Sequence, residues 1–231
     1  MSKNSVYRLS AAALIACAVL SVLGGSAHPI DDGQAHTVHT LTQPIFPYAH
    51  FAIWFGALLL MVGLPAAIHF LAPHVGRIGL AGLGIYFVAN AVSVQSGLTV
   101  EGFVVPAIAA DPAARHLIDE TGTITTATWF NNISMVSGLL FMVSMLLVGI
   151  GLFRSRVVAR WVGVVLGAGA LFLLVVLPMG PMQPLLTGLF IELPRGVAVA
   201  AIGIAMFRAL RPADAAPAWR LQEAAASTAR T

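Results

Sequence analysis

Long apolar stretches separated by short polar segments dominate this chain. The longest runs from Phe46 to Leu71 and contains no Lys, Arg, Asp or Glu. At about 1.5 Å per residue it exceeds the roughly 20 residues that cross a bilayer. Apolar residues occupy all sides of the helix it would form, which is typical of a membrane span and not of an amphipathic helix on a soluble core.

The same pattern predicts six spans. They fall at about residues 9–25, 46–71, 78–100, 129–153, 161–177 and 185–207. Short connections make some consecutive helices antiparallel neighbours. The sequence therefore predicts an all-α fold, a polytopic transmembrane helix bundle over residues 1–211, followed by a flexible cytoplasmic tail at 212–231.

Two of these segments leave alternatives open. Lys3 and Arg8 precede an apolar run that ends in small residues, a pattern shared by a signal peptide and by an uncleaved first span. Cleavage after Ala27 would leave five spans instead of six. The third segment stays apolar past Glu101 as far as Ala110, which is too long for the hydrocarbon core. It must tilt, break near Gly102 or Pro106, or rise above the membrane.

Composition and charge agree with a membrane location. The chain is 58% hydrophobic and only 9% charged, against about 25% charged in soluble domains. Ten of the twelve basic residues fall on one side of the predicted bundle, which the positive-inside rule makes cytoplasmic. These ten are Lys3, Arg8, Arg77, Arg154, Arg156, Arg160, Arg208, Arg211, Arg220 and Arg230.

This threading predicts a multi-pass protein of the bacterial inner (cytoplasmic) membrane with both termini in the cytoplasm. The basic residues mark span ends, so they do not indicate a nucleic-acid partner. The expected partner is the lipid bilayer, and a second copy of the chain or another membrane protein remains an open alternative.

Ionisable residues inside a predicted span suggest a function, because each costs about 2.5–3.5 kcal/mol to insert. Glu192 and Arg195 lie within the last span and share one helix face. Glu101, His50 and Asn131 lie at a similar depth, so all five could line a polar cavity that opens to the outer face and binds a small ligand or ion. The alternative is an ion pair between Glu192 and Arg195 that only satisfies itself.

A second group of polar residues lies in the loop after the first span. Imidazoles and carboxylates are ligands for transition metals, and this loop is predicted to bind one in the periplasm. The candidates are His28, Asp31, Asp32, His36 and His39. The alternative is a solvated loop, because gathering ligands from a flexible segment costs conformational entropy.

The sequence gives little support to a catalytic, nucleotide-binding or haem site. The sequence has no GxSxG, Walker A or GxGxxG motif, and no catalytic residue is predicted. The intramembrane histidines His50 and His69 share one span and lie about 28 Å apart, so they cannot ligate one haem. No cofactor is predicted.

Several short motifs give the chain a resemblance that runs over most of residues 9–208. They are His28-Pro29, Ala49-His50, Arg77-Ile78-Gly79, Arg160-Trp161 and the segment from Val100 to Ala110. In these the chain resembles a group of small uncharacterised bacterial integral membrane proteins with six predicted spans. The resemblance implies that the first span is kept, and it implies no activity.

The sequence therefore leaves three functions in order of preference. The first is transport or small-ligand binding through the outward-facing polar cavity. The second is a structural or interaction subunit of a membrane complex. The third is metal binding by the periplasmic loop.

Overall fold

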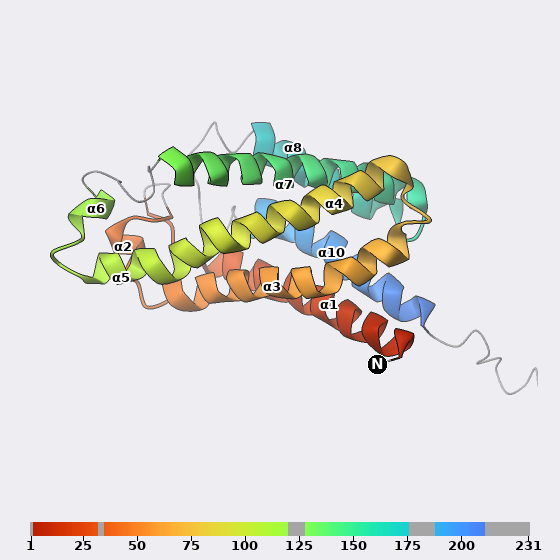
Figure 1. Cartoon of the computed structure of the whole chain (residues 1–231), viewed down its shortest axis with the longest axis horizontal. Helices are drawn as coiled ribbons and strands as arrows, with labels where there is room; N and C mark the ends of the chain where they lie inside the picture. Colours follow the sequence, from red (N-terminus) through yellow and green to blue (C-terminus); the bar gives the residue numbers. More distant parts are fainter. Residues whose placement is uncertain (1, 32–34, 120–127, 176–187, 211–231) are drawn as a thin grey trace, which may run out of the picture.

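The computed structural model describes residues 2–31, 35–119, 128–175 and 188–210 of the 231-residue chain. Within these residues the chain forms helices and no strand, which confirms the predicted all-α fold (Figure 1). The predicted tail at 212–231 lies outside the described residues.

The long helices fall where the apolar segments predict them. Their bounds are α1 Lys3–Ala27, α3 Phe46–Leu71, α4 Gly76–Val92, α7 Thr128–Ser155, α8 Arg160–Val175 and α10 Leu193–Ala209. Three wide π-helical turns adjoin them. These are η1 Ser93–Leu98, η2 Val100–Val104 and η4 Gly188–Glu192. The short helices are α2 Val38–Leu41, α5 Val105–Ala110 and α6 His116–Asp119.

Five of the described helical stretches are long and apolar enough to cross a membrane. They are Asn4–Ala27, Phe46–Leu71, Gly76–Ala110, Asn132–Ser155 and Phe190–Ala209. Helix α8 is apolar but shorter, with 16 residues described. Large apolar side chains such as Leu23, Val62 and Val88 are exposed on the outside of the bundle. These features mark the chain as a membrane protein, because water would not favour so many apolar side chains on the surface.

The third helical stretch differs from the prediction of a span at 78–100. It continues without a break from Gly76 to Ala110. Gly102 lies inside the π-helical turn η2, and Pro106 lies in the first turn of α5, which follows η2 directly. Wide turns thus take the place of the helix break that was one of the expected alternatives.

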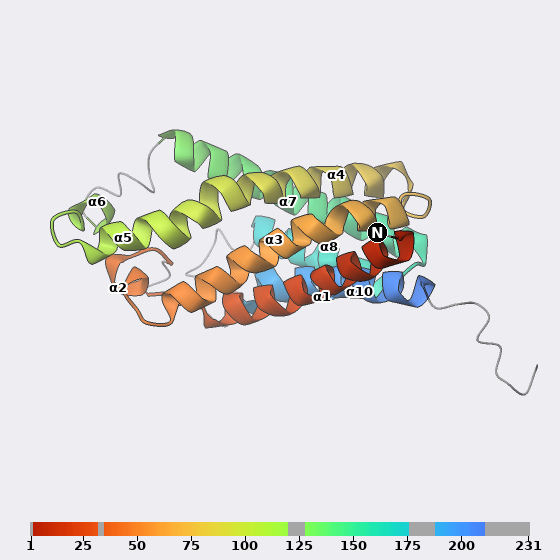
Figure 2. The same cartoon turned by 60° about the horizontal axis from the view of Figure 1, so that its bottom comes forward.

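The helices close into a ring. Helix α1 lies between α3 and α10, α8 between α10 and α7, and α4 between α7 and α3. Figure 2, turned from the view of Figure 1, shows α1, α3 and α10 side by side along the bundle. The N-terminal segment is therefore part of the packed bundle and contributes Ala11, Leu14 and Cys17 to its core.

Glycines let the helices approach closely. A Cβ atom on Gly163 would lie 2.5 Å from the carbonyl oxygen of Gly149 across the α7–α8 contact. The GxxxG spacing of Gly163 and Gly167 serves helix packing here, as it does between membrane helices in general.

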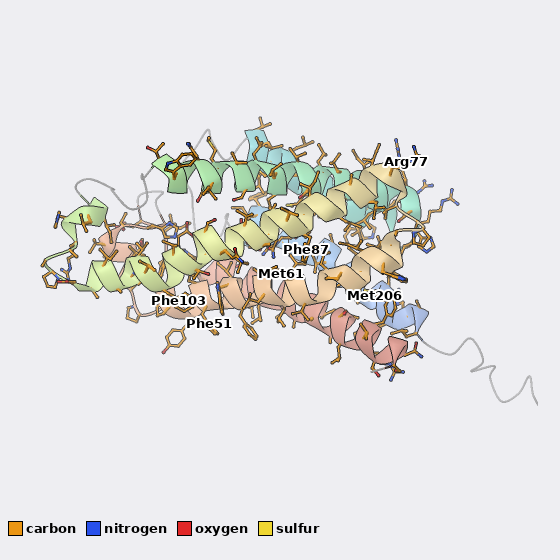
Figure 3. The ribbon with its side chains drawn as sticks, in the orientation of Figure 1. Phe51, Met61, Arg77, Phe87, Phe103 and Met206 are labelled. Atoms are coloured by element: carbon orange, nitrogen blue, oxygen red, sulfur yellow. The ribbon has the colours of Figure 1, made fainter. Side chains whose placement is uncertain are left out.

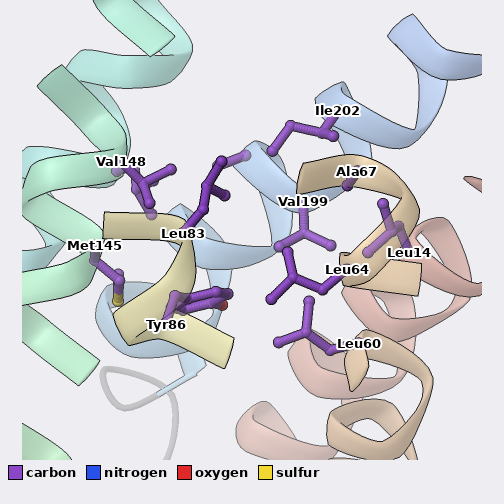
Figure 4. A pocket seen from close by; sticks show the side chains of 12 residues that line it. Leu14, Leu60, Leu64, Ala67, Leu83, Tyr86, Met145, Val148, Val199 and Ile202 are labelled. Carbon is purple, nitrogen blue, oxygen red and sulfur yellow. The ribbon is translucent and has the colours of Figure 1, made fainter. Parts of the chain in front are cut away.

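Apolar side chains fill the centre of the ring. Figure 4 shows residues of α1, α3, α4, α7 and α10 pointing toward one another, among them Leu14, Leu64, Leu83 and Val199. The cavity they leave is about 20 Å³, room for about one water molecule, and its lining is apolar. This part of the bundle is closely packed and dry.

The two ends of the bundle differ in chemistry. We call the end where α1 finishes and α3 begins the histidine end, because it carries His28 and His50. The opposite end, which bears the start of α1 and Arg77, is the arginine end (Figure 3). Described basic residues cluster at it. They are Lys3, Arg8, Arg77, Arg154, Arg156, Arg160 and Arg208.

Candidate functional site

Three histidines meet at the histidine end. His28 follows the last residue of α1, His36 precedes α2, and His50 lies one turn into α3. One ligand-capable nitrogen of each lies within 4.8 Å of the others. His28 and His50 are buried and His36 is half-buried. We call these three residues the histidine triad.

Backbone carbonyls fix which nitrogen of each buried ring carries the hydrogen. His50 Nε2 donates to the carbonyl oxygen of Leu98 at 2.8 Å, and His28 Nδ1 donates to that of Pro29 at 3.1 Å. A carbonyl oxygen can only accept, so His50 Nδ1 and His28 Nε2 keep their lone pairs. These two nitrogens face each other at 3.5 Å. Nothing in the described protein lies between them to attract both lone pairs.

The third ring completes the cluster. His36 Nε2 is buried and has no hydrogen-bond partner among the described residues. It lies 3.8 Å from Oε2 of Glu101, which projects from the π-helical turn η2. A carboxylate thus borders the three histidine rings.

Aromatic packing forms the wall of the triad. The Phe46 ring is fully buried and stacks on His50 with ring centroids 5.4 Å apart. Its edge contacts with His28 and His36 have centroid distances of 5.1 Å and 6.4 Å. Phe46 also belongs to a small apolar cluster with Leu41, Val105, Ala109 and Ile118. The triad is therefore packed against buried aromatic and apolar side chains.

Two of the triad histidines, His28 and His36, lie outside the membrane-spanning helices and are held neutral. Burial, followed by the neighbouring His36 and His50, lowers the pKa of His28 to about 4. Burial also lowers the pKa of His36. Both rings therefore keep an unprotonated nitrogen at neutral pH, which is the form that binds a metal ion.

The π-helical turns bring the third helical stretch against the triad. Such turns widen the helix locally and are frequent at functional sites. Gly102 makes the close approach feasible, because a Cβ atom there would lie 2.9 Å from His50 Nε2. Trp54 Nε1 donates to Thr99 Oγ1 at 3.1 Å and ties α3 to the same segment.

The structure divides the metal ligands predicted in the loop. His28 and His36 join the triad, whereas His39 is exposed and lies 2.9 Å from Asp31. His39 and Asp31 therefore form a separate surface pair that does not belong to the triad. Asp32 lies outside the described residues. His50, assigned from the sequence to the polar cavity, is the residue that completes the triad.

A polar cavity of about 290 Å³ lies behind the triad, toward the middle of the bundle. Glu101, Glu192 and Arg195 all line it, together with Asn90 and Ser134. Of the two other residues predicted there, the side chain of Asn131 is outside the described part of the chain. His50 does not line the cavity, but Leu98, which accepts its hydrogen bond, does.

Arg195 is the central group of this cavity. It donates a hydrogen bond to Glu192 and lies over the ring of Phe141, 5.6 Å from the centroid. Its Nε is buried and has no hydrogen-bond partner among the described residues, and the same holds for Oγ of Ser134. The ion pair expected as the alternative thus exists, and it leaves one donor of the guanidinium unused.

The fold and these two sites define the class of protein: an α-helical membrane protein with a histidine cluster at one end of its bundle and a polar cavity beside it. No family model, no curated protein and no solved structure matches the chain. The function must therefore be argued from the residues themselves.

Proposed function

We propose that this membrane protein binds a transition-metal ion through the histidine triad, His28, His36 and His50. One observation carries the proposal. The lone pairs of His28 Nε2 and His50 Nδ1 face each other at 3.5 Å, and each ring is locked in that orientation by a backbone carbonyl. A carbonyl partner on the far nitrogen is the arrangement that orients histidine ligands toward metals.

A metal ion accounts for the cluster better than a shared proton does. A proton between His28 and His50 would give one bond and would leave His36 Nε2 without a partner. An ion engages all three rings. In a tetrahedral site with metal–nitrogen bonds of about 2.0–2.1 Å, ligand nitrogens lie about 3.3 Å apart. The spacing of 3.5 Å already observed is close to that value.

Glu101 supplies the fourth donor in this proposal. It borders His36 and carries a negative charge that offsets part of the charge of a divalent ion. Three imidazoles and one carboxylate suit Zn²⁺ among the divalent first-row ions, although Cu²⁺ binds nitrogen sites more tightly in general. Zn²⁺ is the ion we propose. It would fasten the segment that carries His28 and His36 onto α3 and η2.

The distribution of basic residues supports one orientation of the protein in the membrane. We propose that the arginine end lies in the cytoplasm of a bacterial cell and that the histidine end faces the periplasm, in line with the positive-inside rule. The metal would then be taken from the periplasmic side of the inner membrane. Reporter fusions at Gly76 and Ser155 test this orientation, and a periplasmic signal from both would contradict it.

The metal site is tested by titration of the purified full chain with Zn²⁺ after chelator treatment. Wild type is expected to bind one ion per chain, measured by elemental analysis after dialysis. His28→Ala, His36→Ala and His50→Ala should each weaken binding more than about 100-fold, because loss of a ligand exceeds the 10–100-fold cost of losing a residue that only orients one.

The matched control is His39→Ala. It removes a histidine from the same loop but outside the triad, and binding should stay as in wild type. Equal binding by wild type and His50→Ala, or an equal loss in His39→Ala, would sink the proposal.

A second function is favoured by the unused donor of Arg195. We infer that the polar cavity binds a small polar ligand, because Arg195 Nε and Ser134 Oγ are buried without a partner, and such groups cost about 1–3 kcal/mol each. Arg195 Nε can only donate, and two carboxylates also line the cavity, which favours a neutral ligand that offers an acceptor atom. Native mass spectrometry should find a small molecule retained by wild type and lost from Ser134→Val; equal spectra contradict this function.

A further inference from the structure

A cavity at the arginine end has a chemistry unrelated to the histidine triad. It measures about 570 Å³ and lies where the connection between α7 and α8 meets the end of α10. Arg156 and Arg208 line it together with Trp161. The rest of the lining is apolar and includes Phe70, Val158, Val162, Ala201 and Ile204.

The described lining of the cavity carries positive charge. Both arginines are exposed, and among the residues that the structure describes no carboxylate lines the cavity. The described acidic residues belong to the other half of the bundle. They are Asp31, Glu101, Asp111, Asp119 and Glu192. Arg160, the first residue of α8, lies over the ring of Phe153 at 5.7 Å from its centroid. An anion is the ligand that this pattern favours.

The backbone conformation of Arg156 also supports an anion-binding site. Its φ is +58°, the single positive value of a non-glycine residue in the described chain. That conformation costs a residue with a Cβ about 1–2 kcal/mol, and glycine or asparagine fills it more readily. An arginine at such a position is explained if this backbone conformation is what places its guanidinium at the cavity.

The position of the cavity relative to the membrane–water interface favours one kind of anion. Trp161 is 59% exposed beside the two arginines, and tryptophan prefers the membrane–water interface. The apolar lining continues from it along α10 through Ala205, Ile204 and Ala201, away from the arginine end. A ligand that fills the whole cavity therefore needs an anionic head and an apolar body.

We propose that this cavity binds an anionic phospholipid, with its phosphate between Arg156 and Arg208 and an acyl chain along the apolar lining. Basic pockets between membrane helices on the cytoplasmic side bind lipid head groups in this way. The site is independent of the metal proposed at the other end, and it anchors the arginine end at the interface.

The test compares phosphatidylglycerol with phosphatidylcholine of the same acyl chains, titrated onto the delipidated full-length protein and followed by native mass spectrometry. At about fivefold per arginine, wild type should prefer phosphatidylglycerol by about 25-fold. Arg156→Asn and Arg208→Gln should each reduce this preference about fivefold, and the double variant should abolish it. Asparagine is chosen at 156 because it tolerates the positive φ.

Arg77→Gln is the matched control. It removes one exposed arginine at the same end but outside the cavity, and the preference should persist. Equal binding of the two lipids by wild type would overturn the proposal. An equal loss in Arg77→Gln would show a diffuse surface attraction instead of a site. Displacement by inorganic phosphate at the same concentration would show that the cavity recognises a phosphate alone.

Discussion

The two halves of the described bundle are held together differently. Toward the arginine end, helices meet through apolar side chains and glycine contacts, with a core cavity of only about 20 Å³. Toward the histidine end, buried polar groups accumulate. They include His28, His50, Asn90, Ser137, Glu192 and Arg195. The cavity there is about 290 Å³.

The backbone follows the same division. All three described π-helical turns, η1, η2 and η4, belong to the polar half. In η1 the carbonyl oxygen of Leu98 accepts a hydrogen bond from His50 of α3. Polar burial is costly in a membrane unless each group finds a partner. The dry half therefore supplies stability, and the polar half buries groups that cost part of it.

The largest expected effect comes from the buried ion pair. Glu192→Gln leaves the guanidinium of Arg195 buried without its carboxylate, and the loss of one partner of such a pair costs about 3–5 kcal/mol. The free energy of unfolding, measured by denaturant titration in mixed micelles, should fall by that amount.

The double variant Glu192→Gln with Arg195→Met is the control. A neutral pair of similar volume should restore unfolding to within about 1 kcal/mol of wild type, because no uncompensated charge remains. A double variant as unstable as the single one would show that the pair does more than neutralise itself.

A substitution in the dry half should cost less. Gly163→Ala places a Cβ 2.5 Å from the carbonyl oxygen of Gly149, and overpacking of this kind costs about 1–3 kcal/mol. Gly138→Ala in α7 is the control, since nothing lies within 4 Å of its new Cβ. It should be neutral or slightly stabilising. Equal stability of the two variants would contradict the close packing of α7 on α8.

The smallest effect concerns the contact between the third helical stretch and the triad. Gly102→Ala pushes a Cβ toward the His50 ring, which should weaken Zn²⁺ binding about tenfold through loss of ligand orientation. Gly97→Ala, on the same stretch but with nothing within 4 Å of the added atom, should bind as wild type does. Unchanged binding in Gly102→Ala would place the metal, if any, away from His50.

Much of the fold could be predicted from the sequence because membrane spans are set by length and apolarity alone. The helices α3 and α7 begin and end within a few residues of the predicted segments, and α10 ends close to the predicted end of the last one. The third stretch could not be predicted in full. Its continuation past Val100 depends on π-helical turns, which have no simple sequence signal, and on the packing of α5 against residues Leu41 and Phe46.

The candidate site could be predicted only in part. The sequence placed His28 and His36 in one group and His50 in another, since it gives depth but not which faces meet. A usable signal existed: His28 ends one helix and His50 begins the next long one, so both must lie at the same level. Helix rotation, which brings His50 toward His28 and away from the cavity, depends on close contacts such as that of Gly24 with Ala49.

Metal binding by the histidine triad is the central claim about the polar half. X-ray absorption at the zinc edge of the Zn²⁺-loaded full-length protein tests it most directly. The account predicts four nitrogen or oxygen neighbours at about 2.0–2.1 Å, with the outer scattering of three imidazoles that His50→Ala reduces and His39→Ala does not. A spectrum of oxygen neighbours without imidazole scattering, unchanged in His50→Ala, would contradict it.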